Sequence, residues 1–323
     1  NFLGSVYYEG KYLKRDINKA IYYYSIAASQ NHSYAQFNLG KIFYDGEYVT
    51  GDINKSIHYY SLSANNNCIY AQKALGNIYY NGKYDTVRDI QKAIYYFSLA
   101  ANQNDMESQL NLGDIYYFAH NNLRDIDKAI HYYSMAANQN NVKAQLILGS
   151  IYENGIYIQR DIKRAIQYYS LAANQNNNQE AQFILGSIYE KGIYFHQDIK
   201  KAIHYYSLSA NQNNVKAQIN LGKIYHSIKY NMQDMNKAIK YYLLAANQND
   251  PEAQTLLGLI YFNGKYVKQD INKAIRYYSL AANQNYPVAS NELGYIYSTS
   301  RYVQCDMKKA IHYYLSAANK NYS

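Results

Sequence analysis

Residues Asp161 to Asn177 read DIKRAIQYYSLAANQNN, and close variants of this stretch return along the whole chain of 323 residues. Each copy opens on an aspartate, and successive aspartates lie 36 or 37 residues apart. They are Asp16, Asp52, Asp89, Asp125, Asp161, Asp198, Asp234, Asp270 and Asp306. A fixed period of this length predicts a solenoid, in which each repeat packs only against its neighbours.

The quoted stretch has the pattern of an amphipathic helix. Ala165, Ile166, Tyr169 and Ala172 recur with a spacing that places them on one helical face. Asp161 is placed to cap the helix, because its carboxylate can accept hydrogen bonds from the free backbone N–H groups of the first turn. The closing asparagines tolerate the left-handed conformation that often ends a helix.

A second helical pattern precedes each stretch and is seen whole in AQLILGSIYENGIY, residues 144–157. Ala144, Leu148 and Ile151 fall on one face of it. We therefore predict an all-α protein, an α/α solenoid of nine two-helix repeats. The repeats are expected at about 1–31, 32–67, 68–104, 105–140, 141–176, 177–213, 214–249, 250–285 and 286–323, as a single array over residues 1–323. Because the chain begins and ends inside a repeat, we expect the natural protein to be longer.

A Leu-Gly pair stands in the middle of every first helix. Its glycines are Gly4, Gly40, Gly76, Gly113, Gly149, Gly186, Gly222, Gly258 and Gly294. Glycine inside a helix costs roughly 0.5–1 kcal/mol, so nine of them predict a close approach between neighbouring backbones. A second glycine ends the first helix in six copies and is replaced by Ala119, Ile228 and Ser300 in the other three. Those three turns should differ in shape.

The net charge of +9 arises from 32 basic and 23 acidic residues and is spread along the chain. Much of the basic charge lies three residues after each capping aspartate, as at Lys19 and Lys55. We interpret these cations as solvated partners of the aspartates. A phosphate-binding edge is the less favoured alternative, because the aspartate already occupies the anion-attracting position. The 44 tyrosines and the absence of tryptophan indicate an AT-rich source genome.

Nothing in the sequence predicts catalysis. No phosphate-binding loop, nucleophile elbow or zinc spacing occurs. His58, His131, His204 and His312 share one register, so they lie at least a repeat apart and cannot converge on one metal ion. We expect them to be exposed, and we predict no catalytic residue, no cofactor, no metal and no small-molecule substrate.

The positions of the cysteines and the lengths of the apolar runs give two further expectations. The two cysteines, Cys68 and Cys305, lie more than six repeats apart, so no intramolecular disulfide is predicted, which fits a reducing compartment. No apolar run approaches the ~20 residues that span a bilayer, so no membrane span is predicted.

A glutamine follows the first-helix alanine in most copies. The set is Gln36, Gln72, Gln109, Gln145, Gln182, Gln218 and Gln254, with Ser290 in the last copy. We favour hydrogen bonding between adjacent repeats, since the position flanks the helix where a neighbour should lie. The alternative is a row of donors and acceptors for the backbone of a partner.

The repeated pattern A-x-x-x-L-G-x-x-Y-x-x-G, a tyrosine two residues later, then D-x-x-K-A-I-x-Y-Y-x-x-A-A-x-Q, resembles the Sel-1-like repeat, a relative of the tetratricopeptide repeat. The resemblance covers the whole chain. It departs from the family in placing tyrosine where tryptophan is common and asparagine where glycine usually ends the second helix. What it implies is a right-handed superhelix and an adaptor that holds other proteins together.

The face of the first helix opposite its buried side is the predicted binding surface, lining the concave side of the solenoid. This stripe consists of Phe37, Tyr44, Tyr80, Leu110, Tyr117, Leu146, Glu153, Phe183, Glu190, Ile219, His226, Leu259, Phe262 and Tyr295. Its apolar character marks an interaction surface for a protein or peptide partner that the residues do not name. The competing interpretation is that a tightly wound superhelix buries the stripe against itself.

A nucleic-acid reader, of the kind that binds one base per repeat, is the alternative function. It would need a basic groove to engage phosphates. Here lysines such as Lys41 and Lys73 are mixed with carboxylates such as Asp114 and Glu153, so we favour a protein partner over RNA.

Overall fold

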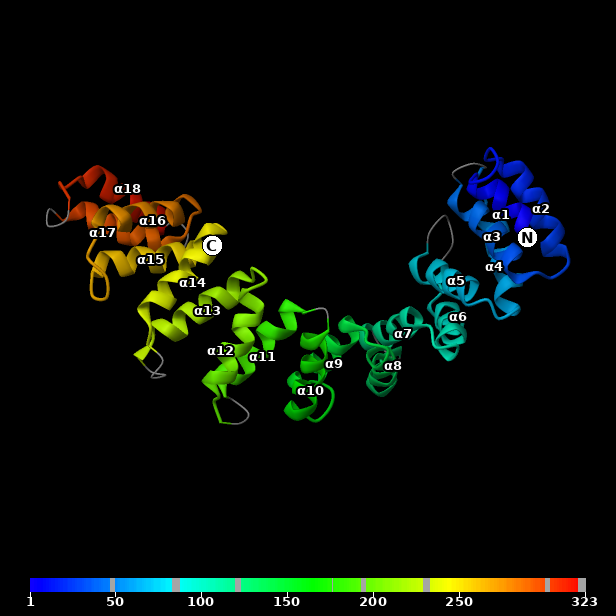
Figure 1. The fold of residues 1–323 in the computed structure, drawn as a ribbon, viewed down its shortest axis with the longest axis horizontal. Helices are drawn as coiled ribbons and strands as arrows, with labels where there is room; N and C mark the ends of the chain where they lie inside the picture. Colours follow the sequence, from blue (N-terminus) through cyan, green and yellow to red (C-terminus); the bar gives the residue numbers. More distant parts are fainter. Residues whose placement is uncertain are drawn as a thin grey trace. The chain divides into compact units, whose positions relative to one another are not determined.

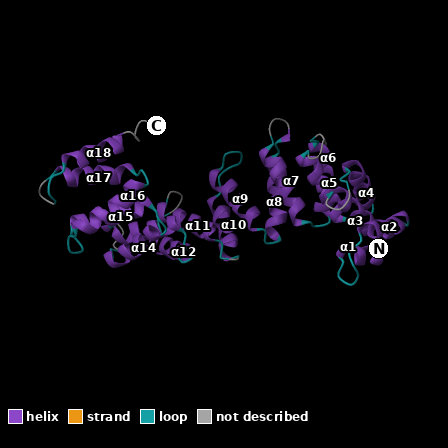
Figure 2. Ribbon diagram, turned by 90° about the horizontal axis from the view of Figure 1, so that it is seen from above, coloured by secondary structure: helices purple, strands orange, loops and turns teal. Residues whose placement is uncertain are grey.

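The computed structural model describes residues 1–46, 50–82, 88–119, 123–175, 177–192, 196–228, 233–299 and 303–318. Eighteen α-helices and no strand occur among these residues. Figure 2 draws the helices in purple and the loops that join them in teal. They form two compact units, Asn1–Asp161 and Ile162–Ser323. The predicted all-α class is confirmed.

The first unit contains nine helices, drawn from blue to green in Figure 1. They are α1 (Phe2–Glu9), α2 (Ile17–Ser29), α3 (Ser33–Asp45), α4 (Ile53–Asn65), α5 (Ile69–Asn81), α6 (Ile90–Asn102), α7 (Met106–Phe118), α8 (Ile126–Asn138) and α9 (Val142–Asn154). Within this unit, consecutive helices pack on one another, from α1 on α2 to α8 on α9. This is the nearest-neighbour packing of an α/α solenoid.

The second unit also contains nine helices, drawn from green to red. They are α10 (Ile162–Asn174), α11 (Gln179–Lys191), α12 (Ile199–Ala210), α13 (Val215–His226), α14 (Met235–Asn247), α15 (Pro251–Asn263), α16 (Ile271–Asn283), α17 (Pro287–Ser298) and α18 (Met307–Ala318). The same sequential packing links them. Odd-numbered helices are the first helices of the repeats in both units, and even-numbered helices are the second.

The second helices begin and end as the sequence predicts. In eight of them the opening aspartate accepts a hydrogen bond at 2.9–3.0 Å from the backbone N–H three residues later. Eight asparagines between consecutive repeats have φ angles from 52° to 68°, the left-handed conformation expected of them. The aspartates and asparagines thereby fix where each helix starts and stops.

The lysine three residues after each capping aspartate is held by two partners. In eight repeats its Nζ lies 3.1–3.7 Å from the aspartate Oδ2. The same Nζ lies 5.0–5.4 Å from the ring centroid of an aromatic residue on the first helix. That ring is stacked on a tyrosine of the second helix, with centroids 5.7–6.0 Å apart. The interpretation of these lysines as aspartate partners is confirmed.

The Leu-Gly glycines contact aromatic rings rather than a neighbouring backbone. A Cβ added to Gly113 would lie 2.5 Å from Cδ1 of Tyr133, on the second helix of the same repeat. The same contact, at 2.4–2.8 Å, joins seven other glycines to a tyrosine or to Phe97. The expected close approach is present, but our expectation of a backbone partner was wrong, because a large ring occupies the space that the missing side chain leaves.

The glutamines join adjacent repeats and are buried. Gln109 on α7 donates from Nε2 to the carbonyl oxygen of Ala101 at the end of α6, at 3.3 Å. Its Oε1 accepts a hydrogen bond of 2.8 Å from Gln139, which follows α8. Each such glutamine therefore satisfies a helix-end carbonyl of the preceding repeat. Hydrogen bonding between repeats is confirmed, and burial rules out the alternative of a row open to a partner.

The first helices end in two different ways. Six of them end at a left-handed glycine with φ between 58° and 69°. The ends of α7, α13 and α17 are instead the extended residues Ala119, Ser227 and Thr299. The predicted difference in these three turns is confirmed, although Ser300 lies outside the described residues.

Replacing Gly113 with alanine tests the contact between ring and glycine. Helix propensity alone favours Gly113→Ala by roughly 1 kcal/mol. The clash with Tyr133 should outweigh this gain and lower the free energy of unfolding by about 1–3 kcal/mol, as in other overpacked sites. Urea unfolding followed by circular dichroism measures the change. Gly51→Ala is the control, since its added Cβ would come no closer than 3.5 Å to another residue. Equal stability of the two variants would contradict the ring contact.

Candidate functional site

The predicted stripe lies on the first helices, opposite their buried face. In α9, Ala144, Leu148 and Ile151 are at most 5% exposed, whereas Leu146 and Glu153 are half-buried. The first helix therefore has the two unlike faces that its pattern predicts.

The fourteen stripe residues differ in how open they are. Eleven are half-buried. Ile219 is only 5% exposed and lies in a core cluster with Tyr242 and Leu257, so no partner can reach it. Leu259 and Tyr295 are the most open, at 37% and 43% exposure. The most exposed apolar residues of the stripe thus lie on α15 and α17.

Contacts with tyrosines cover part of Phe37 and Phe183, two of the half-buried members. The ring of Phe37 on α3 lies 5.6 Å from that of Tyr60 on α4 and 5.7 Å from that of Tyr70 on α5. Phe183 lies 5.6 Å from Tyr206 in the same manner. A stripe residue near the start of its helix is therefore partly covered by its own repeat and, for Phe37, by the next one.

The buried tyrosines of the second helices extend beneath the stripe. The hydroxyl of Tyr133 donates to Oδ1 of Asp114 at 2.8 Å, and that of Tyr206 donates to Oε2 of Glu190 at 2.6 Å. The hydroxyls of Tyr242 and Tyr278 are buried and have no hydrogen-bond partner among the described residues. Burial is the main cause that raises the pKa of each of these four tyrosines.

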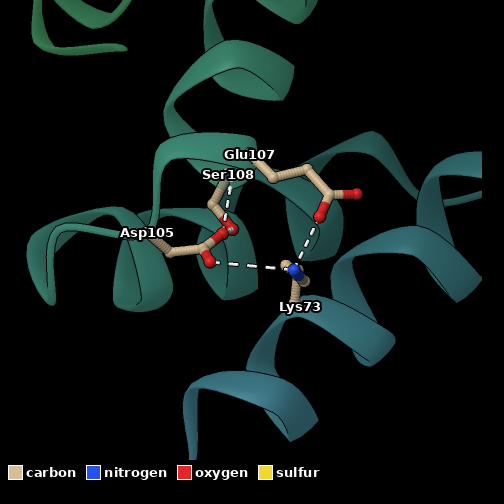
Figure 3. A network of polar contacts seen from close by, with 4 residues as sticks. All are labelled: Lys73, Asp105, Glu107 and Ser108. Carbon is tan, nitrogen blue, oxygen red and sulfur yellow. Dashed lines mark hydrogen bonds and ion pairs between the residues drawn. The ribbon is translucent and has the colours of Figure 1, made fainter. Parts of the chain in front are cut away.

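Charges on neighbouring first helices neutralise one another. Lys73 on α5 lies 2.6 Å from Oε2 of Glu107 and 3.7 Å from Oδ1 of Asp105, whose other oxygen accepts hydrogen bonds from Ser108 (Figure 3). Lys143 pairs with Asp114 at 2.8 Å. A third pair joins α13 to α15, with Lys223 Nζ at 2.6 Å from Glu252. These ion pairs interrupt the basic surface that a nucleic-acid groove requires.

Two pockets lie beside first helices that lack the closing glycine. The pocket in the second unit is about 210 Å³ in volume and adjoins the end of α13. Its lining is His226, Leu259, Ile260, Asn263, Lys265 and Tyr266. The pocket in the first unit is about 400 Å³ in volume and adjoins the end of α7, with Tyr80, Arg88, Asp114 and Phe118 in its lining. His226, Leu259 and Tyr80 are stripe residues, so the stripe supplies part of both pockets.

Sequence reasoning missed several exposed aromatic residues outside the stripe. Tyr34 and Tyr70, at the starts of α3 and α5, are 52% and 55% exposed, with rings 6.3 Å apart. They line a hollow of about 560 Å³ together with Met106. The equivalent position is charged in other copies, as at Glu107 and Lys143. This departure from the repeat pattern was the signal that could have revealed them.

The structure brings no catalytic cluster together in its described parts. His58, His131, His204 and His312 are exposed, as predicted, and each contacts the tyrosine that follows it edge to face. Across the described ranges, no three histidine, cysteine or acidic residues are grouped so as to hold a metal ion. None of the helices in those ranges combines the length and apolar character needed to cross a bilayer.

The repeated helix pair, its asparagine links and its glutamine contacts define a helical-repeat protein of the α/α solenoid class. The Sel1 repeat model matches residues 1–32, 33–68, 69–105, 107–141, 142–177, 179–214, 215–250, 251–286 and 287–322. The chain therefore belongs to the Sel1 repeat family, which confirms the resemblance seen in its sequence.

Solved structures of the same family are similar to this chain. A Sel1 repeat protein from Oxalobacter formigenes is 29% identical, with a TM-score of 0.75 over 93% of this chain and 86% of the other. A protective antigen of uropathogenic Escherichia coli strains with an SLR fold is 28% identical, with a TM-score of 0.54 over 98% of this chain and 75% of the other. No curated protein matches the sequence.

Truncating two stripe residues distinguishes the buried member from an open one. Ile219→Ala removes a core side chain and should lower the free energy of unfolding by about 2–5 kcal/mol. Leu259→Ala should change it by less than about 1 kcal/mol, because Leu259 is already 37% exposed. Urea unfolding compares the two variants. A large loss for Leu259→Ala would mean that the open part of the stripe also belongs to the core.

The buried tyrosines predict a loss of stability at alkaline pH. An unfolded tyrosine titrates near pH 10, whereas burial raises the folded pKa of Tyr60, Tyr133, Tyr206, Tyr242 and Tyr278 above that value. Their contribution to stability is therefore complete below about pH 10 and is lost as the pH rises beyond it. Thermal unfolding at increasing pH measures the effect. Tyr242→Phe removes a buried hydroxyl for which the described residues offer no hydrogen-bond partner, and it should reduce the alkaline loss. A melting temperature independent of pH above 10 would contradict the prediction.

Proposed function

We propose that this chain is a non-enzymatic scaffold that binds a protein or peptide partner on the stripe of its first helices. Sel1 repeats commonly mediate protein interactions, and the match covers all nine copies. The whole chain would act as one array of binding repeats. Repetition holds like side chains apart, whereas catalysis needs unlike groups brought together.

The observation that carries the proposal is the accessible apolar surface on α15 and α17. Leu259 and Tyr295 are both more than a third exposed, and the ring of Tyr295 contacts that of Phe262 edge to face at 6.2 Å. An aromatic pair beside an open leucine is the kind of anchor that a partner covers in a protein interface. The ion pairs between first helices, such as Lys223 with Glu252, favour a protein partner over nucleic acid.

Two exposed leucines of the same repeat allow a matched test. Leu259 lies on α15 within the stripe, and Leu280 lies on the second helix α16 outside it, with exposures of 37% and 41%. A photo-crosslinking residue at position 259 should capture a protein from an extract of the source organism, and the same residue at position 280 should not. The purified partner should then bind Leu259→Ala roughly tenfold more weakly, and Leu280→Ala as well as the unchanged chain.

Two results would contradict the proposal. Equal capture from both positions would indicate non-specific contact, and capture from position 280 alone would place the interface on the second helices. Circular dichroism of each variant confirms that the fold is kept.

A further inference from the structure

We propose that the pocket between α13 and α15 recognises an acidic peptide segment. The carboxylate of the peptide would face Lys265, and an adjacent aliphatic or aromatic side chain would enter the pocket against Leu259 and Ile260. This inference rests on the proposed function and names the chemical class of the partner.

The pocket lies where two neighbouring first helices end in different backbone conformations. The helix α13 ends at His226, and Ser227 follows in an extended conformation with φ −79° and ψ 134°. The neighbouring helix α15 instead ends at Gly264, which is left-handed with φ 62°. The chain therefore leaves α13 and α15 in different directions. The pocket lies beside the end of α13, the helix that lacks the closing glycine.

The size and floor of the pocket suit a peptide side chain. Its volume of about 210 Å³ is far more than one water molecule needs, yet it is below the roughly 300 Å³ at which pockets for whole small molecules begin. Ile260 forms a buried part of the wall, and Leu259 an exposed part. Below them Tyr242 is fully buried, with its ring 6.3 Å from that of His226. The apolar wall of the pocket packs on the core and offers a contact surface for an apolar side chain of the peptide.

The charge at the pocket is positive. Lys265 lies 5.0 Å from the ring centroid of Tyr266, and the described residues contain no ion-pair partner for it. The two aspartates that follow these loops are already engaged, since Asp234 pairs with Lys237 at 3.1 Å and Asp270 with Lys273 at 3.5 Å. An incoming carboxylate would thus complement a cation that the described part of the chain does not neutralise.

His226 adds a neutral polar group at neutral pH. Burial first, and the nearby charge of Lys265 second, lower the pKa of His226 below its usual value. The uncharged imidazole can accept or donate one hydrogen bond without adding a second charge. Lys265 is therefore the group that selects for an acidic ligand.

The pocket of the first unit repeats this combination. It lies at the end of α7, where Ala119 is extended with φ −58° and ψ 147°. The guanidinium of Arg88 lies 5.3 Å from the ring centroid of Tyr80, and Phe118 contributes an apolar wall. Among its described lining residues the one carboxylate is Asp114, which is held by Lys143 and Tyr133, both at 2.8 Å. A missing glycine, an apolar wall and a cation on a tyrosine occur together in both units, which supports a shared ligand chemistry.

Selection from random peptides tests the proposal with the whole 323-residue chain. A phage-displayed library of random peptides is the probe. Enriched sequences should place an aspartate or glutamate beside an aliphatic or aromatic residue. A synthetic peptide of that sequence should bind Lys265→Glu at least roughly tenfold more weakly than the unchanged chain, and should lose affinity when its acids are replaced by amides.

Lys268→Glu is the matched control, because Lys268 is an exposed lysine of the same loop that does not line the pocket. It should bind the synthetic peptide as the unchanged chain does, apart from a small effect that added salt screens. Lys265 is exposed as well, so circular dichroism should show both variants folded.

Four outcomes would overturn the inference. Enriched peptides without acidic residues would refute the inference, and so would equal losses of affinity for Lys265→Glu and Lys268→Glu. The proposed scaffold function would still stand if the crosslinker at position 259 captures a protein. If polyuridylate RNA displaces the peptide, and binding of the RNA also depends on Lys265, the pocket binds phosphates rather than peptide carboxylates. Failure to enrich any peptide, together with no capture at position 259, would refute the inference and the scaffold alike.

Discussion

The contact between a second-helix ring and a first-helix glycine is the constraint on which the repeat depends. The ring of Tyr133 lies where the side chain of Gly113 would otherwise be, and seven other described glycines share this arrangement. A ring laid flat on a helix backbone buries a large apolar surface in a small space. Any residue with a Cβ would push the two helices apart, so glycine at this position sets their spacing and keeps the surrounding alanines in contact.

Because the helices of a pair lie this close, small side chains of the second helix pack around the contact. Ala129, Ala136 and Ala137 on α8 are almost completely buried. Residues of this size bury little surface each, and a single repeat cannot offset the conformational entropy of ordering its residues. Stability must therefore come from adjacent repeats, through contacts such as the glutamine bridges and the tyrosine rings that reach the next first helix. The larger apolar residues of the first helices divide between two faces: Leu257 and Ile260 are buried, whereas Leu259 and Tyr295 are exposed and available to a partner.

Local pattern was enough to predict the helices, their caps and their buried faces. Asp16 caps α2, and Asn31 is left-handed after it, because both roles depend on residues close in sequence. What lies across from a residue depends on packing, which a pattern within one helix does not contain. The partner of Gly113 was therefore expected to be a backbone and is a ring. For the same reason Ile219, assigned to an open face by its position, lies in the core.

The glutamine contacts make most of the boundaries between repeats chemically alike. Gln109 bonds to Ala101 and Gln139 in the way that Gln218 bonds to Ala210 and Gln248, although the two sets lie in different units. Removing or duplicating one whole period would bring an equivalent acceptor to each glutamine, whereas a cut within a period would leave a buried amide unsatisfied. Unequal recombination between copies of the coding sequence can thus lengthen or shorten the array without a new interface having to evolve. The length of the surface offered to a partner then changes by one whole repeat at a time.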